Sequence, residues 1–384
     1  MILVKKGDLV ISGINVEKGA LSVYEEDEDA LATIHYSSYE YDKNQVDIEY
    51  LKWFLKSRTF QNIVKEQAGG GIKTELKAKK FLPLKIKLPG LDAQIDIARK
   101  IDNVAAEIND LSETNNHNQT LLIQLRQTIL QEAVQGKLVP QDTNDEPAGE
   151  LLKRIEAEKE KLITEGKIKK QNPLPPIAED EVPYKLPQGW EWTNIQNISY
   201  QVTDGEHATP ARIDIKEIPL ATAKNVRDGY LDITVTDFVS NKTAKKCWNR
   251  CKPQHNDILM VCVGATTGRL CVIKNPPDIV LVRSVALIRP MSPYIQSEYL
   301  SIVLKSSLGQ SQIWGNVKQS AQPCLYLNKI NRINIPCPCT NEQKRIVAKV
   351  DQLMNLCDDL ETRLNQSKKD SEMLMQAVLH EAFS

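Results

Sequence analysis

Apolar residues recur at alternating spacings of four and three in two stretches of this chain. The first series runs from Ile97 to Ile129, and the second from Ile346 to Val378. This spacing is the a/d seam of a heptad pattern, which predicts long helices with one apolar stripe. Each stretch of roughly 38 residues makes a helix about 57 Å long. A helix of that length needs a partner stripe, and the chain carries two.

The two stretches belong to one long repeat. Glu342–Phe383 lies over Ala93–Val134 without a gap, at an offset of 249 residues, and Gln343 falls on Gln94. The same offset places Asn256–Val272 over Gly7–Val23. A repeat of this length indicates two copies of a whole domain rather than a solenoid. The alternative, two unrelated surface helices on a larger core, does not account for the shared register.

Polar residues interrupt the seam in the same region of the two copies. They are Asn115 and Asn118 in the first copy, and Ser367 and Ser371 in the second. Polar seam residues can fix pairing register at a cost in stability. They also occur where a partner protein inserts, so both explanations stay open.

Before each long stretch, short strand-like segments are followed by a helix-spaced one, as in Gln296–Ile313. We therefore expect an α+β protein with two domains of mixed sheet and helix joined by the long helices. Prolines and charges between the copies indicate an extended linker. The expected division is 1–91, a partial first domain; 92–136, the first long helix; 137–183, a charged helix and proline-rich linker; 184–335, the second domain; and 336–384, the second long helix.

The two copies differ at their fronts. The second copy begins roughly 65 residues before the position that matches Met1, which is why a repeat of unequal halves is expected. The stretch that includes "GWEWTNI" and "TDGEHATP" has no counterpart in the first half. We therefore expect the first domain to lack its opening third.

Composition is ordinary for a globular protein, with 26% charged and 41% apolar residues among 384. Lys5 and Lys6 follow the short apolar run at Met1, an order that is wrong for a signal peptide. No stretch approaches the 18 or so apolar residues of a membrane span. We expect a cytoplasmic protein without membrane association.

The net charge of −1 hides an asymmetry. Residues 184–335 hold 18 Lys and Arg against 11 Asp and Glu, whereas residues 1–91 hold 14 against 13. A local basic excess favours phosphate binding more than the sum over the chain does. Scatter in surface charge is the alternative explanation.

Candidate chemistry is sparse. Cys337 and Cys339 suggest a metal site, but Leu88 and Gly90 replace them in the other copy, and the spacing is a poor zinc signature. Asn275–Asp278 reads "NPPD", similar to a methyltransferase motif that ends in an aromatic, but Asp278 cannot stack on a base. No phosphate-binding glycine loop is present. We expect no catalytic residues, no cofactor and no metal.

The second domain instead carries five polar loops with suitable donors for DNA. Arg and Lys bond guanine edges, Asn and Gln bond adenine edges, and lysines bind phosphates. One such loop alone is more often a solvated turn. The candidate DNA-binding residues are His207, Thr209, Lys224, Asn225, Arg227, Lys245, Lys246, Arg250, Thr266, Thr267, Arg269, Lys318, Gln319, Ser320 and Gln322.

Together these segments resemble a known family. "LPQGWEWTNI", "TDGEHATP", "IPLATAKNVRDGYLD" and "NDILMVCVGATTGRLCVI" are similar to the target-recognition domain of specificity subunits in type I restriction-modification enzymes. "PCPCTNEQKRIVAKVDQLMNLCDDLE" is similar to the conserved helix that follows it, and "ELLKRIEAEKEKL" to the central conserved region. Each segment is a weak signal, and the set is specific.

The resemblance implies two target-recognition domains that each read half of a split DNA site. It implies that the long helices pair antiparallel and hold those domains apart. Methyltransferase subunits and motor-nuclease subunits would be the protein partners, and double-stranded DNA the ligand. Methyl donor, ATP and Mg²⁺ would belong to those partners.

Two other functions remain open at this point. The chain could be a fragment of a fused DNA methyltransferase-nuclease, which methyl transfer by the chain alone would reveal. It could also be a coiled-coil adaptor without DNA binding, whose affinity for DNA would not fall steeply with salt.

Overall fold

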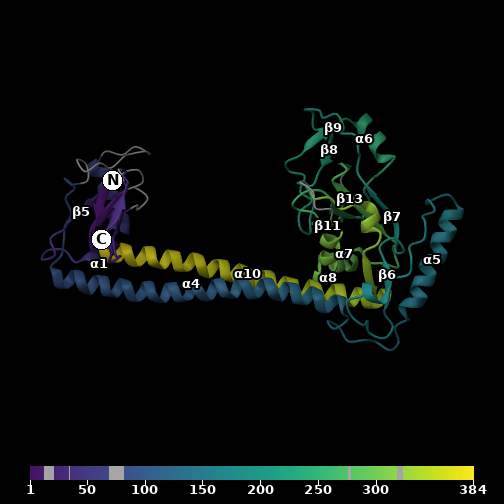
Figure 1. The fold of residues 1–384 in the computed structure, drawn as a ribbon, viewed down its shortest axis with the longest axis horizontal. Helices are drawn as coiled ribbons and strands as arrows, with labels where there is room; N and C mark the ends of the chain where they lie inside the picture. Colours follow the sequence, from purple (N-terminus) through teal and green to yellow (C-terminus); the bar gives the residue numbers. More distant parts are fainter. Residues whose placement is uncertain (13–20, 34, 69–81, 276–277, 318–322) are drawn as a thin grey trace. The chain divides into compact units, whose positions relative to one another are not determined.

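The structure is a computed structural model that describes residues 1–12, 21–33, 35–68, 82–275, 278–317 and 323–384 (Figure 1). The chain forms two compact units. Unit 1 comprises Met1–Leu121 with Asp359–Ser384, and unit 2 comprises Leu122–Asp358. Both mix strands and helices, so the predicted α+β class is confirmed. None of the described helices has the length and apolarity that a membrane span requires.

Two helices of 44 residues each run through both units. They are α4 (Leu91–Val134) and α10 (Thr340–Phe383). Each unit therefore contains the start of one long helix and the end of the other. In unit 1, Asn115 Nδ2 donates to Ser367 Oγ at 3.1 Å. In unit 2, Arg126 Nη2 donates to Asp358 Oδ1 at 2.6 Å. Within each unit the pairing is antiparallel, as predicted.

The predicted seam is only partly buried. Ile101, Leu122 and Cys357 are buried in it. The seam leucines Leu111, Leu125, Leu360 and Leu374 are instead 42–52% exposed, so the partner helix covers the predicted apolar stripe only in part.

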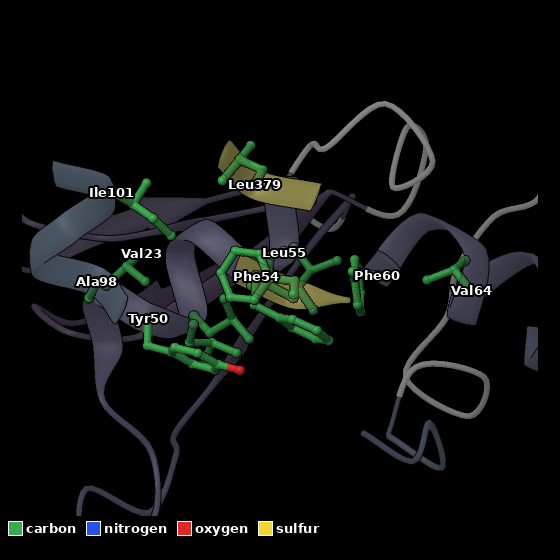
Figure 2. Close-up of a cluster of buried hydrophobic side chains, with 13 residues drawn as sticks. Val23, Tyr50, Phe54, Leu55, Phe60, Val64, Ala98, Ile101 and Leu379 are labelled. Atoms are coloured by element: carbon green, nitrogen blue, oxygen red, sulfur yellow. The ribbon is translucent and has the colours of Figure 1, made fainter. Parts of the chain in front are cut away.

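Unit 1 has two small sheets, of three and two strands, and two short helices. The strands are β1 (Ile2–Val4), β2 (Leu9–Ser12), β3 (Leu21–Val23), β4 (Ala30–Ala32) and β5 (Tyr36–Tyr39); the helices are α1 (Ile48–Lys56) and α2 (Arg58–Ala68). The strands order as β3-β2-β5, with β1 paired to β4. Figure 2 shows the core, in which Phe54 and Tyr50 of α1 meet Ile101 of α4 and Leu379 of α10. The core thus anchors both long helices.

Unit 2 has a larger set of strands and helices around a buried antiparallel sheet. Its main sheet orders as β11-β10-β13-β7, and smaller ones as β12-β8-β9 and β14-β6. The strands are β6 (Glu191–Asn194), β7 (Ser199–Asp204), β8 (Ile218–Ala221), β9 (Asp237–Val239), β10 (Ile258–Val261), β11 (Leu270–Val272), β12 (Val280–Leu281), β13 (Val285–Pro290) and β14 (Asn334–Cys337). The helices are α5 (Ala148–Thr164), η2 (Glu179–Glu181), α6 (Asn241–Trp248), α7 (Ser297–Lys305), α8 (Ser307–Gly315) and α9 (Leu327–Ile330).

The predicted repeat is confirmed down to side-chain hydrogen bonds. Gln94 Oε1 accepts from Asp47 N at 2.9 Å, and Gln94 Nε2 donates to Gln45 O and Pro89 O, both at 2.9 Å. The Gln94 side chain is buried, so the bonds satisfy backbone groups that water cannot reach.

Gln343 repeats this network at the same offset. It accepts from Gln296 N at 2.9 Å and donates to Pro338 O at 3.1 Å and Tyr294 O at 3.4 Å. In both units the glutamine fastens the first turn of a long helix to its own domain.

Among the described residues, unit 1 has no strand that matches β6, β7, β8 and β9 at the front of the copy, or β14 just before α10. β2, β3 and β5 correspond to β10, β11 and β13 at the offset of the repeat. The segments of β6 and β7 precede any position matched in unit 1. Among the described residues of unit 1, no strand takes the place of either.

Candidate nucleic-acid interface

Four turns of unit 2 are joined by backbone hydrogen bonds into one group. We call residues 204–209, 222–229, 262–269 and 282–284 the loop cluster. Arg283 N donates to Glu206 O at 3.0 Å, and Cys262 N to Ser284 O at 2.8 Å. Gly229 N donates to Leu270 O at 3.1 Å, directly after the turn at 264–269. Loops that lie far apart in sequence are thus held together by backbone bonds at the ends of the sheet strands.

Close packing fixes the first turn of the loop cluster. A Cβ at Gly205 would lie 2.2 Å from both the carbon and the oxygen of the Leu281 carbonyl. Only glycine fits there, since real side-chain carbons never approach backbone that closely. Glu206 N then donates to Leu281 O at 2.7 Å. The turn that carries His207 is therefore pinned against β12.

Asp204 brings two of the candidate residues together. His207 Nε2 lies 2.7 Å from Asp204 Oδ2, and Arg250 Nη2 lies 3.0 Å from His207 Nε2. Arg250 also donates to Asp204 Oδ1, and its Nε to Asp204 O at 3.2 Å. The carboxylate holds both side chains at the end of β7 while they stay exposed. Such an arrangement orients donors for an anionic ligand.

Helix α6 presents its lysines on the surface. Ser240 caps its N-terminus by accepting from Thr243 N. Ala244 and Cys247 bury one face against Val280 of β12. Lys245 and Lys246 occupy the other face and are exposed, so two point charges lie beside the loop cluster. Lysine ammonium groups there are free to meet phosphates.

The turn between β10 and β11 buries one candidate DNA-binding residue and leaves two accessible. Thr267 is 3% exposed, and its hydroxyl donates to Gly264 O at 2.7 Å. It shapes the turn and offers no accessible group. Thr266 and Arg269 are less buried and remain available at the edge of the loop cluster.

Asn225 also serves the fold in this conformation. It is 3% exposed; its Oδ1 accepts from Thr222 N at 2.9 Å, and its Nδ2 donates to Asp232 O at 2.9 Å and Val235 O at 3.2 Å. These bonds occupy the amide that the sequence suggested for an adenine edge. Its neighbour Lys224 is accessible, and Arg227 Nε lies 3.7 Å from Asp232 Oδ2 with its side chain 45% exposed.

The remaining candidates fall in two groups. Thr209 is exposed just after His207. Lys318, Gln319, Ser320 and Gln322 lie outside the described residues. The sequence pattern did not indicate Asp204 or the exposed Arg283 of the loop cluster. Residue type did not suggest Asp204, because a carboxylate repels the phosphates of DNA. The only signal for it was its place at the end of β7, three residues before His207.

All eight cysteines are free thiols. Burial raises the pKa of the Cys337 thiol to about 12, and burial also raises the pKa of Cys339. Protonated thiols of this kind are poor metal ligands.

One group among the described residues has metal-ligand types close together, namely Asp145, Cys339 and Glu342. Each carboxylate there is already engaged. Arg345 Nη2 donates to Asp145 Oδ2 at 2.6 Å. Glu342 accepts from Gln141 Nε2 at 2.6 Å and from Trp190 Nε1 at 2.9 Å. The arrangement therefore clamps the start of α10.

The long helices expose apolar side chains in both units. In unit 2, Ile123, Leu125 and Leu356 are 45–65% exposed. In unit 1, Leu111 and Leu374 line a shallow groove of about 440 Å³ between α4 and α10. Apolar side chains gathered on a helix pair are typical of a protein-binding surface.

The sequence of this chain is similar to a known protein family. Residues 213–367 match the family described as "Type I restriction modification DNA specificity domain". The EcoAI type I restriction enzyme specificity subunit of Escherichia coli is 36% identical over 277 residues, which cover 66% of this chain and 43% of the relative. The EcoEI specificity subunit, also from Escherichia coli, is 35% identical over 266 residues, with the same coverage. The chain spans less than half the length of these curated relatives.

Solved structures share the fold. The HsdS subunit from Thermoanaerobacter tengcongensis aligns with a TM-score of 0.58 and 17% identity, over 99% of this chain and 81% of that chain. A chain from work on complex assembly and conformational transition of the type I R-M system aligns with a TM-score of 0.64 and 16% identity, over 99% and 82%. At these identities the likeness concerns the fold alone.

Proposed function

This chain belongs to the family of specificity subunits of type I restriction enzymes, and from that premise we propose that it binds DNA sequence-specifically without catalysing a reaction itself. Its place of action would be the cytoplasm, together with methyltransferase and motor-nuclease subunits. Methyl transfer, ATP use and cleavage would be carried out by those partners.

The observation that carries this proposal is the loop cluster of unit 2. It carries His207, Lys224 and Arg269; Arg250 bonds to His207, and Lys245 and Lys246 lie on the neighbouring α6. Guanidinium groups suit guanine edges, and ammonium groups suit phosphates. The excess of basic residues in 184–335 supports the same assignment. Asn225 and Thr267 would act by shaping the turns rather than by touching bases.

We further propose that the two units read the two parts of a split site unequally. Unit 1 has no counterpart in this chain of β7, of the turn at His207, or of Lys224 and Arg227. Its balance of 14 basic against 13 acidic residues in 1–91 gives little attraction to phosphates. Unit 2 would therefore supply most of the sequence preference.

The exposed leucines of α4 and α10 suit the proposed protein partners. An apolar helix pair with polar surroundings is a surface that a second protein can bury. Methyltransferase subunits would be the first to dock there. The same surface also fits the coiled-coil adaptor hypothesis, which predicts protein binding without DNA binding.

Titration of DNA binding against salt tests the proposal. Each phosphate contact adds about −0.9 to the slope of log affinity against log salt, so Lys245→Ala with Lys246→Ala should reduce the slope by about 2. Lys161→Ala on α5 removes a like charge outside the loop cluster and should leave the slope unchanged. Affinity that does not respond to salt would instead favour an adaptor without DNA binding.

Base reading is tested separately from phosphate binding. Arg269→Ala should relax the preference at one base position and cost about 1–3 kcal/mol there. Methyl transfer by the chain alone, with DNA and methyl donor, would instead favour a methyltransferase fragment.

A further inference from the structure

In unit 2, β14 has a different neighbour on each edge. Asn334 N donates to Gln312 Oε1 at 2.7 Å, and Gln312 Nε2 donates to Asn334 O at 2.9 Å. On the opposite edge β14 pairs antiparallel with β6, with Ile335 opposite Thr193 and Cys337 opposite Glu191. Ile195 N donates to Ile333 O at 3.2 Å at the end of this ladder. Residues 333, 335 and 337 therefore face β6, because backbone groups alternate between edges.

In unit 1, the segment that matches β14 also has one edge bonded to a glutamine side chain. Lys85 corresponds to Asn334, and its N–H donates to Gln67 Oε1 at 3.0 Å. Gln67 Nε2 in turn donates to Lys85 O at 3.2 Å. A glutamine of the preceding helix thus holds one edge of the segment, as Gln312 does in unit 2. The segment is held on the same edge as β14.

The second edge of this segment has no partner among the described residues. The N–H and C=O groups of Ile86 and Leu88, which match those of Ile335 and Cys337, make no hydrogen bond within that part of the chain. Ile86 and Leu88 are half-buried, whereas Ile335 and Cys337 are each 1% exposed. Leu84, Ile86 and Leu88 already pack on the core of unit 1. An apolar segment with an open hydrogen-bonding edge is a template for a further strand.

A tyrosine at the same place also differs between the units. Tyr299 donates its hydroxyl to Pro336 O at 2.6 Å, which secures the middle of β14. The matching Tyr50 is 4% exposed and makes no such bond to a described residue. The segment in unit 1 therefore lacks the tyrosine hydrogen bond that holds β14 in place beside β6.

We propose that 84–88 of unit 1 is a docking edge for an extended segment of another polypeptide, which adds antiparallel as β6 does in unit 2. The proposal concerns protein binding and does not depend on DNA recognition. Its occupant has the chemistry that the repeat displays: an extended stretch with polar or aromatic side chains on the face of Lys85 and Lys87. In unit 2 those two positions face Asn194 and Trp192.

The residue that precedes β6, Trp190, has contacts in unit 2 that unit 1 cannot offer to an occupant. Trp190 lies against Tyr299 with ring centroids 6.5 Å apart, and its Nε1 donates to Glu342 Oε2. In unit 1, Phe383 lies against Tyr50 with centroids 5.3 Å apart, and Ala93 stands where unit 2 has Glu342. The occupant therefore needs no aromatic residue at the Trp190 position.

The test uses the full chain and a synthetic peptide of residues 186–197 that carries Trp190→Leu. This change removes the bond to Glu342, so the peptide should not displace β6 from unit 2. Hydrogen exchange of individual amides, with and without peptide, reports where it binds. We expect slower exchange at Ile86 and Leu88 and no change at Ile335. No protection at Ile86 and Leu88 with saturating peptide would overturn the proposal.

Two proline variants supply the matched control. Ile86→Pro removes an N–H that faces the docking strand and should weaken peptide binding about tenfold, the equivalent of one hydrogen bond and the gap it leaves. Lys87→Pro should bind the peptide normally, because unit 2 has Pro336 at that position and its nitrogen faces away from β6. Equal affinity of both variants would overturn the proposal even if peptide binds.

The identity of the occupant is tested by dilution without peptide. Protection of Ile86 and Leu88 that grows with protein concentration would overturn the proposal, since a second copy of this chain would then be the occupant. Protection in the unsubstituted chain does not depend on how the proline variants fold. None of these outcomes depends on whether the chain binds DNA.

Discussion

Unit 1 and unit 2 share the contacts that anchor the long helices, which we call the frame, and they differ in their loops. Gln94 and Gln343 make the same three bonds at the start of the two long helices. Ser57 and Ser306 both donate to the carbonyl three residues earlier, at 2.6 and 2.7 Å. The turns with His207 and Lys224 exist in unit 2 only. The comparison teaches that helix anchoring and the proposed DNA reading are carried by separate parts of this domain.

The largest effect on stability is expected at the C-terminal ends of the long helices. Phe383 of α10 packs edge-on against Tyr50 and Phe54, with ring centroids 5.3 and 5.6 Å apart. Phe383→Ala should lower the free energy of unfolding of unit 1 by about 3–5 kcal/mol. Val134 of α4 is the equivalent residue in unit 2 and is fully buried.

Val134→Ala is the matched variant and should cost unit 2 about 1–3 kcal/mol. Hydrogen exchange of each unit under native conditions reads the two stabilities separately. A loss of stability that spreads equally over both units would contradict the view that each unit has its own core.

A somewhat smaller effect is expected at the shared glutamines. Gln343→Ala leaves the N–H of Gln296 without its partner and removes one hydrogen bond from each of the Pro338 and Tyr294 carbonyls, at a cost of about 2–4 kcal/mol. Gln94→Ala should cost unit 1 a similar amount for the same reason. Denaturant unfolding with exchange detection measures both. Unequal costs would show that the frames, and not only the loops, have diverged.

The smallest expected effect lies in a support that only unit 2 has. Lys159 of α5 donates its Nζ to Gln196 O at 2.5 Å, and burial lowers the pKa of Lys159 to about 8. Between pH 8 and the ordinary value near 10.5, the unfolded chain binds more protons than the folded one. The free energy of unfolding of unit 2 should therefore rise with pH across that window.

Lys159→Met should remove this rise and leave unit 1 unchanged. Thermal unfolding at several pH values from about 7.5 to about 10.5 provides the measurement. A rise of the same size in the methionine variant would show that another group is responsible.

The frame was predictable from sequence because its signals are local and repeated. Heptad spacing indicated both long helices, and the offset between Gln94 and Gln343 indicated the repeat. Burial along the helix pair was harder, because a seam pattern does not say which leucines a two-helix contact can cover. Leu111 and Leu374 are seam residues by their spacing, but both are exposed.

The candidate site was predictable only as a set of loops. Residue type suggested that Asn225 and Thr267 meet DNA, but tertiary hydrogen bonds within the turns occupy their polar groups. The pairing of Arg250 with Asp204 joins residues from two distant segments, which no local pattern encodes. A loop's donors can be read from sequence, whereas their orientation is set by contacts across the sheet.

The base preference of the chain, assembled with methyltransferase subunits alone and measured on a randomised DNA library, tests the central claim most directly. We predict strong preference on one side of the bound site, contributed by the loop cluster of unit 2, and weak or no preference on the other. Two parts of equal strength would contradict the account, because unit 1 would then read DNA without the segments that unit 2 uses.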